Sequence, residues 1–87
     1  MTALGMTLYD QAASIVLEQA RESRGMPKAE LARRAGISER SVKYYLNGER
    51  AMTLGAFRAL LAVLGIGNEQ AAHLIESALA ALQKAEK

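Results

Sequence analysis

The sequence predicts an all-α protein, folded as a compact bundle of five short helices. Apolar residues recur at steps of three and four along most of the chain, and no segment alternates apolar and polar residues long enough to favour a strand. Glycine, proline and capping residues interrupt this pattern at short intervals, which divides the chain into helix-length pieces. The chain has 87 residues, of which 51% are hydrophobic and 23% charged, as expected for one small globular domain.

A glycine and a proline separate the first two predicted helices. Apolar residues at helical spacing predict the first helix over residues 9–23. Gly25 ends it, because glycine adopts the left-handed conformation that commonly follows a helix. Pro27 begins the second helix, in the first turn where its missing N–H is not needed. We expect this helix to end at about Ala35.

The third helix is predicted between two glycine breaks. Gly36 supplies a tight turn after the second helix, because glycine takes the left-handed conformation without strain. Ser38 is expected to cap the third helix through its hydroxyl. The helix runs to about Leu46 and stops at the dipeptide Asn47–Gly48.

Two further helices complete the predicted bundle. Thr53 is expected to cap a fourth helix with one apolar stripe. The text "GIGN" ends it, and Asn68 is expected to cap the fifth helix. Small and apolar residues recur along this last helix before a short charged tail.

Charge is distributed unevenly along the chain. Residues 28–50 contain six basic and three acidic residues, whereas residues 59–87 contain two basic and three acidic residues. A positive region in the middle suits a nucleic-acid partner, although an ordinary solvated surface would also explain it.

The composition argues against several classes of protein. With no cysteine and one histidine, His73, the chain offers no thiolate or metal-ligand set and no nucleophile–base arrangement. We therefore expect no enzyme, no metal and no cofactor. No apolar run approaches the roughly 20 residues of a membrane span and no secretory signal is visible, so we expect a cytoplasmic protein.

The second and third helices, joined by Gly36, can pack at a steep angle and project the third helix outward. This geometry requires three residues in particular. Ala32 must be small where the helices cross, Gly36 must make the turn, and Val42 must fill the space between the helices.

These residues carry a resemblance to a known family. The text "RESRGMPKAELARRAGISERSVKYYLNGERAMTLGAFRALLAVLGI", residues 21–66, is similar to the Cro and lambda-repressor type of helix-turn-helix domain, the XRE family. It has the small residue, the turn glycine, the apolar plug, the "NG" ending and the following amphipathic helix. The resemblance implies a five-helix lambda-repressor-like bundle that binds specific sequences of double-stranded DNA, usually as a dimer, and regulates transcription.

The helical pattern and the resemblance together suggest how the chain is organised. Residues 1–7 are expected to form a flexible N-terminal arm, and residues 8–66 the helix-turn-helix DNA-binding domain. Residues 67–87 are expected to add a C-terminal helix and short charged tail to the same domain, and to offer a dimer surface.

Residue roles follow from the resemblance together with the helical pattern. Val42 and Tyr45 are expected to face inward, which leaves the remaining side chains of the third helix outside. The family's base-reading positions fall on Glu39, Arg40 and Tyr44. Candidates for phosphate contacts are Lys28, Ser38, Ser41, Lys43 and Asn47.

Glu39 is acidic at a position that faces DNA. A carboxylate in the first turn of a helix is favoured by the helix dipole, by about 0.3–1 kcal/mol. It could also accept a hydrogen bond from the N4 amine of cytosine. We expect both roles, with the helix-stabilising one better supported by the sequence.

Leu46 departs from the family pattern. A polar or acidic residue often stands just before "NG" in this family and pairs with an arginine of the first helix. Arg21 is the matching arginine here, but Leu46 cannot pair with it. Leu46 either packs inward or is available to a partner.

The fifth helix carries a second apolar face that suits a homodimer. Its candidate residues are Leu74, Ala78 and Leu82. A two-fold dimer would place two reading helices about 34 Å apart on a near-palindromic site.

Three functional interpretations remain open. The leading one is a dimeric, sequence-specific DNA-binding regulator, a phage- or prophage-type repressor. The second is an antitoxin or other module whose main partner is a protein, such as a toxin or anti-repressor, with DNA binding secondary. The third is an interaction module that has lost DNA binding, which Glu39 favours, whereas Lys28, Arg40 and Lys43 argue against it.

Overall fold

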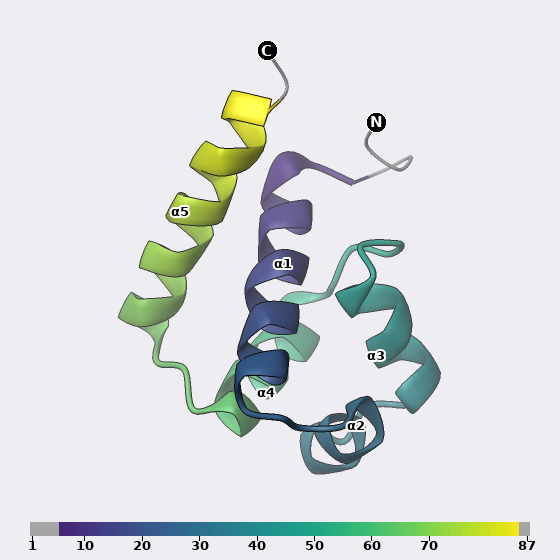
Figure 1. The fold of residues 1–87 in the computed structure, drawn as a ribbon. Helices are drawn as coiled ribbons and strands as arrows, with labels where there is room; N and C mark the ends of the chain where they lie inside the picture. Colours follow the sequence, from purple (N-terminus) through teal and green to yellow (C-terminus); the bar gives the residue numbers. More distant parts are fainter. Residues whose placement is uncertain (1–5, 86–87) are drawn as a thin grey trace.

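The computed structural model describes residues 6–85, and within this range the chain forms five α-helices and no strand (Figure 1). The all-α, five-helix prediction is therefore confirmed. The helices are α1 (Leu8–Ser23), α2 (Lys28–Ala35), α3 (Glu39–Leu46), α4 (Leu54–Leu64) and α5 (Asn68–Ala85). None of these helices is long and apolar enough to cross a lipid bilayer.

The first helix begins at a capping box. The Thr7 hydroxyl accepts a hydrogen bond from the Asp10 amide at 3.2 Å, and the Asp10 carboxylate accepts from the Thr7 amide at 2.9 Å. The expected flexible arm covered residues 1–7, of which residues 1–5 lie outside the described part of the chain. Met6, by contrast, is buried, and Thr7 fixes the start of α1, so these two residues belong to the folded bundle.

Serine and threonine caps start the two middle helices. The Ser38 hydroxyl accepts from the Ser41 amide at 3.1 Å, and the Thr53 hydroxyl accepts from the Ala56 amide at 3.0 Å. Asn68 differs from the prediction, because it is the first residue of α5 rather than its cap. The carbonyl of the preceding residue, Gly67, receives the first helical hydrogen bond instead, from Ala71.

The core lies where α1, α2, α3 and α4 meet, and α5 closes it by packing along α1. Side chains from each of the first four helices are fully buried there, namely Leu17, Leu31, Val42, Leu60 and Leu64. Leu46 is also a core residue with 5% of its surface exposed, which decides between the two alternatives predicted for it. It packs inward and offers nothing to a partner.

Figure 1 shows how this packing places the reading helix. Helix α5 runs beside α1 in the opposite direction, and α3 lies on the other side of α1. The outer face of α3 is therefore remote from the surface formed by α5.

Candidate nucleic-acid interface

A glycine turn sets the angle between α2 and α3. Gly36 takes a left-handed conformation, with φ of 72°. Its amide donates to the Arg33 carbonyl, and the Ile37 amide donates back to the Ala32 carbonyl at 3.0 Å. This pattern ends α2 and turns the chain in two residues, as in other left-handed helix caps.

Small and branched side chains fill the crossing of the two helices. Ala32 is 2% exposed and Val42 is fully buried, so α2 and α3 approach closely around them. Because Val42 and Leu46 occupy successive turns of α3 and both face the core, the opposite side of the helix is its outer face.

That outer face is polar and solvent-accessible. Glu39, Arg40 and Lys43 are exposed, and Tyr44 is half-buried. Tyr45 was expected to face inward, and it lies half-buried against the core. The three candidate base-reading residues thus lie on one helix with accessible side chains, and Arg40 and Tyr44, one turn apart, are in contact.

Tyr44 lies at the centre of a cluster with two arginines. The Arg50 guanidinium carbon lies 4.7 Å from the centroid of the Tyr44 ring, and that of Arg40 lies 5.7 Å from it. Both distances fall within the range of cation–π attraction. Arg40 Nη2 also donates a long hydrogen bond to the Tyr44 hydroxyl, at 3.4 Å.

Arg50 has no role predicted from the sequence, because it lies in a loop outside the reading helix. A turn at the end of α3 brings Arg50 next to the Tyr44 ring. Gly48 has φ of 72°, and the Glu49 amide donates to the Tyr44 carbonyl at 2.9 Å. The signal was present in the "NG" ending, since a left-handed glycine after a helix reverses the chain over its last turn.

The two arginines of the cluster have no acidic partner among the described residues. Three ion pairs are recorded among residues 6–85, and neither Arg40 nor Arg50 takes part in any of them. The nearest acidic side chains along the chain have other partners, because Glu39 lies 3.8 Å from Lys43 Nζ and Glu49 accepts from Asn47. The cluster is therefore available to an anionic partner.

Glu39 occupies the first turn of α3, directly after the Ser38 cap. Its carboxylate pairs with Lys43 one turn later, at 3.8 Å, and both side chains are more than half exposed. A pair of this kind contributes about 0.3–0.5 kcal/mol and breaks readily. The carboxylate can therefore stabilise the helix and still turn towards a ligand.

Of the five candidate phosphate-binding residues, Ser38 and Ser41 lie at the start of α3, Lys43 in its last turn and Asn47 at its C-terminal cap. Ser38 and Ser41 bond to each other, with 2.9 Å between their hydroxyl oxygens, and the Asn47 side-chain amide donates to Glu49 at 3.3 Å. Lys28 is half-buried at the start of α2. It lies close enough to Glu18 for its charge to contribute to lowering the pKa of that carboxyl, after the larger effect of Arg21. Ser38 donates in the bond to Ser41 and would have to release it to reach a phosphate, whereas the Ser41 hydroxyl and the second amide hydrogen of Asn47 can donate without losing these partners.

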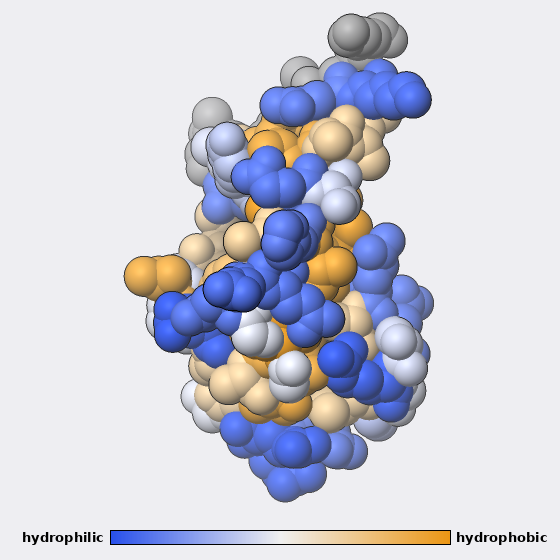
Figure 2. All heavy atoms as spheres, turned by 90° about the vertical axis from the view of Figure 1, so that its left-hand side faces the viewer, coloured by the Kyte–Doolittle hydropathy of each residue, from blue (hydrophilic) through white to orange (hydrophobic). Residues whose placement is uncertain are grey.

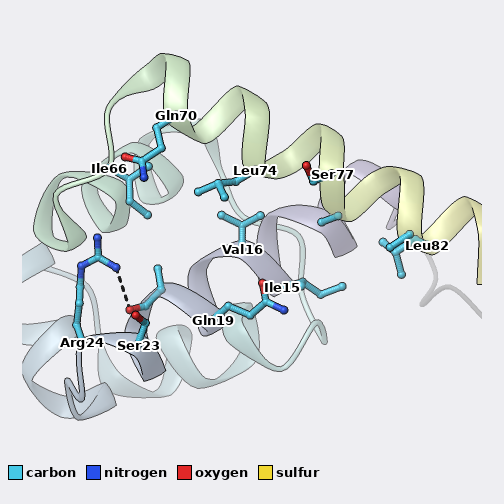
Figure 3. Close-up of a pocket in the computed structure, with 13 residues that line it drawn as sticks. Ile15, Val16, Gln19, Ser23, Arg24, Ile66, Gln70, Leu74, Ser77 and Leu82 are labelled. Carbon is cyan, nitrogen blue, oxygen red and sulfur yellow. Dashed lines mark hydrogen bonds between the residues drawn. The ribbon is translucent and has the colours of Figure 1, made fainter.

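A groove of about 530 Å³ lies between α1 and α5, away from α3 (Figure 3). Leu74, Ala78 and Leu82, the candidate dimer residues, all line it, and Ile15 and Val16 face them from α1. Figure 2 views the molecule from the α5 side and shows a band of hydrophilic side chains with hydrophobic surface on both flanks.

His73 is exposed on α5. Within residues 6–85, no three histidine or acidic side chains are grouped so that they could hold a metal ion.

Comparison with known families gives one match. The family model described as a helix-turn-helix domain matches residues 13–74, which is well over half of the chain. The matched segment contains α2, α3 and α4 complete, together with the turn at Gly36. Searches among curated proteins and among solved structures gave no match.

Proposed function

The chain belongs to the helix-turn-helix family, and from this we propose that it is a sequence-specific regulator of transcription that binds double-stranded DNA through α3. One observation carries this proposal beyond membership of the family. The outer face of α3 presents Arg40 beside Tyr44 and Arg50, with no carboxylate paired to either arginine among the described residues. Such a face is suited to a polyanion that also offers hydrogen-bond acceptors.

The base-reading residues would be Glu39, Arg40 and Tyr44. Arg40 can donate two hydrogen bonds to the O6 and N7 acceptors of guanine in the major groove, and Glu39 can accept from the N4 amine of cytosine. Tyr44 can pack against a thymine methyl group or bond to a phosphate. A cytosine next to a guanine in the bound site would suit the first two residues.

Phosphate contacts would fix the orientation of the domain on the duplex. Lys28, at the start of α2, would make the contact that depends most on salt, together with Lys43 on α3. Ser38, Ser41 and Asn47 would contribute neutral donors around the ends of α3. Residues 8–66 would thus supply the DNA-binding unit, and residues 67–87 would complete the same domain.

We further propose that the protein acts as a homodimer, as a phage- or prophage-type repressor in the cytoplasm. Leu74 is 38% exposed, and it lies in the apolar groove with Ala78 and Leu82. Because α5 and α3 lie on opposite sides of α1, a two-fold axis at this groove would leave both reading helices free. Two such helices would meet successive major grooves of a near-palindromic operator, about 34 Å apart.

The experiment that tests this function is selection of bound duplexes from a random pool, followed by fluorescence anisotropy over a range of salt concentrations. We expect a two-fold-symmetric motif and an affinity that falls steeply as salt rises. Failure to bind any duplex at low salt would refute the DNA-binding proposal.

A second candidate function uses the same fold as a protein-binding module, such as an antitoxin or the target of an anti-repressor. The observation that favours it is the apolar groove between α1 and α5, which an amphipathic helix of another protein could fill. A monomeric protein that binds DNA weakly, together with a stable complex formed through the groove, would favour this candidate.

A further inference from the structure

We propose that Arg50, in the loop after α3, is a positioning residue that controls base preference. Through the Tyr44 ring, it holds Arg40 in the orientation that contacts a base pair. The inference rests on the proposed DNA-binding function. It places a determinant of specificity outside the helix that touches the bases.

The contacts of Arg40 show why it needs such support. Among residues 6–85, the only group that accepts a hydrogen bond from its side chain is the Tyr44 hydroxyl, at 3.4 Å. A bond of this length is weak, and an exposed arginine has many rotamers to lose on binding. These two weak contacts with Tyr44, the hydrogen bond and the ring contact at 5.7 Å, are what can favour one orientation of the Arg40 guanidinium before DNA binds, and both depend on how the ring is held.

Arg50 is the group that can hold this ring. Its guanidinium carbon is closer to the ring centroid than that of Arg40, at 4.7 Å against 5.7 Å. The hydrogen bond from the Glu49 amide to the Tyr44 carbonyl ties the backbone next to Arg50 to the last turn of α3. Because this turn depends on Gly48 in the left-handed conformation, Arg50 is brought to the ring by the fold itself.

The positive charges of Arg40 and Arg50 also favour a positioning role for Arg50. Two guanidiniums near one ring repel each other, and the negative face of the ring offsets part of this repulsion. Removing Arg50 would free Tyr44 and also change where Arg40 is most stable. The expected consequence is a loss of discrimination between bases, rather than a uniform loss of affinity.

A first test uses the free protein and needs no DNA. Proton NMR should show the side-chain methylene protons of Arg50 shifted upfield by the Tyr44 ring. The shift should persist in Tyr44→Phe, which keeps the ring, and disappear in Tyr44→Leu. Unshifted Arg50 protons in the unmodified protein would overturn the inference whatever its DNA binding.

A second test measures base preference on the selected duplex and on duplexes substituted at the base pair that Arg40 contacts. Arg50→Ala should reduce the preference for the selected pair by roughly 2- to 5-fold, with an unchanged salt dependence. Lys84→Ala serves as the control, because it also removes one positive charge but lies near the end of α5. It should leave the base preference as it was.

A direct phosphate contact by Arg50 would give a different result. Arg50→Ala would then weaken binding to all duplexes alike and lower the salt slope by about one, which would overturn the positioning role. Unchanged binding would overturn it too. In a Tyr44→Leu background, Arg50→Ala should cause no further loss of preference, and an additional loss there would contradict action through the ring.

Thermal melting of each variant shows whether the fold is retained. If the unmodified protein binds no duplex, both the proposed function and this inference fail. If it binds a specific duplex and Arg50→Ala keeps its base preference, this inference fails alone.

Discussion

Arg21 and Glu18 form a two-bond ion pair on α1, with donor–acceptor distances of 2.7 and 3.0 Å. Arg21 also donates to the Met26 carbonyl at 2.8 Å, which ties the end of α1 to the loop that leads into α2. Arg21 has no acidic partner at position 46, where the chain carries a leucine. The structure shows that this arginine uses a carboxylate of its own helix and a backbone carbonyl instead.

The Glu18–Arg21 pair should make stability depend on pH in the acid range. The hydrogen bond from Arg21 is the largest cause that lowers the pKa of Glu18, and the charges of Arg21 and Lys28 add to it, while burial acts in the opposite direction. A carboxyl whose pKa is lower in the folded state stabilises the fold above its unfolded pKa. This contribution should be lost as the pH falls below about 4.5 and through the folded value.

Glu18→Gln tests this expectation. The variant should be less stable at neutral pH by up to about 1 kcal/mol and should lose less stability between pH 6 and about pH 3 than the unmodified protein does. Urea unfolding at a series of pH values measures both quantities. Equal acid sensitivity of the two proteins would show that other carboxyls control this range.

Leu46 should contribute to stability through its burial in the core, and an acidic residue in its place should gain nothing from Arg21. Leu46→Ala should lower the free energy of unfolding by about 2–5 kcal/mol, because the side chain is buried in the core. Leu46→Glu should be at least as destabilising, since Arg21 already has its partners. Chemical denaturation of both variants makes the comparison, and a Leu46→Glu protein as stable as the unmodified one would contradict it.

Gly36 and Gly55 form a matched pair for testing the turn. A Cβ added at either glycine meets no atom within 4 Å, so neither substitution creates a clash. Gly36→Ala should nevertheless destabilise by about 1–2 kcal/mol, because φ is positive there. Gly55→Ala, in α4, should stabilise by roughly 0.5 kcal/mol. Thermal melting compares them, and changes of the same sign would argue against backbone strain at Gly36.

Arg40 and Lys43 should affect DNA binding in different ways if the proposed function is correct. Arg40→Ala should cost about 1–3 kcal/mol on the selected site and relax the preference at one base pair. Lys43→Ala should weaken binding to all duplexes alike and reduce the salt slope by about one. Anisotropy titrations at several salt concentrations distinguish the two patterns. If both variants behaved alike, the assignment of base-reading and phosphate-binding roles would have to be revised.

The proposed dimer surface can be tested through Leu74. Leu74→Glu would put a charge in the apolar groove and should shift the protein towards monomer, without unfolding it because the side chain is 38% exposed. His73→Glu, at the neighbouring exposed position, serves as the control and should leave the assembly unchanged. Sedimentation equilibrium measures the result. An unmodified protein that remains monomeric at high concentration would exclude this dimer.

The sequence by itself predicted features that depend on neighbours along the chain. Ser38, Thr53 and Gly36 act within one turn of their own helix, so their residue types were enough to place the breaks between α2, α3 and α4. The capping box that begins with Thr7 is equally local, although that residue was expected in a flexible arm. The outward face of α3 was also predictable, because the inward positions of a helix determine its outer ones. The family resemblance added which of these outward residues would read bases.

Only the tertiary structure decided which residues far apart in the sequence are in contact, and which way a residue faces when its sequence pattern allows two orientations. Leu46 could have faced either way, and only the packing of the other helices around it made its burial favourable. The partners of Arg21 depended on where the loop carbonyl of Met26 came to lie. Arg50 meets Tyr44 because the chain reverses after α3, and α1 meets α5 across a groove because the helices between them fold back. A periodic pattern specifies the face of one helix, whereas contacts such as these depend on the relative placement of several.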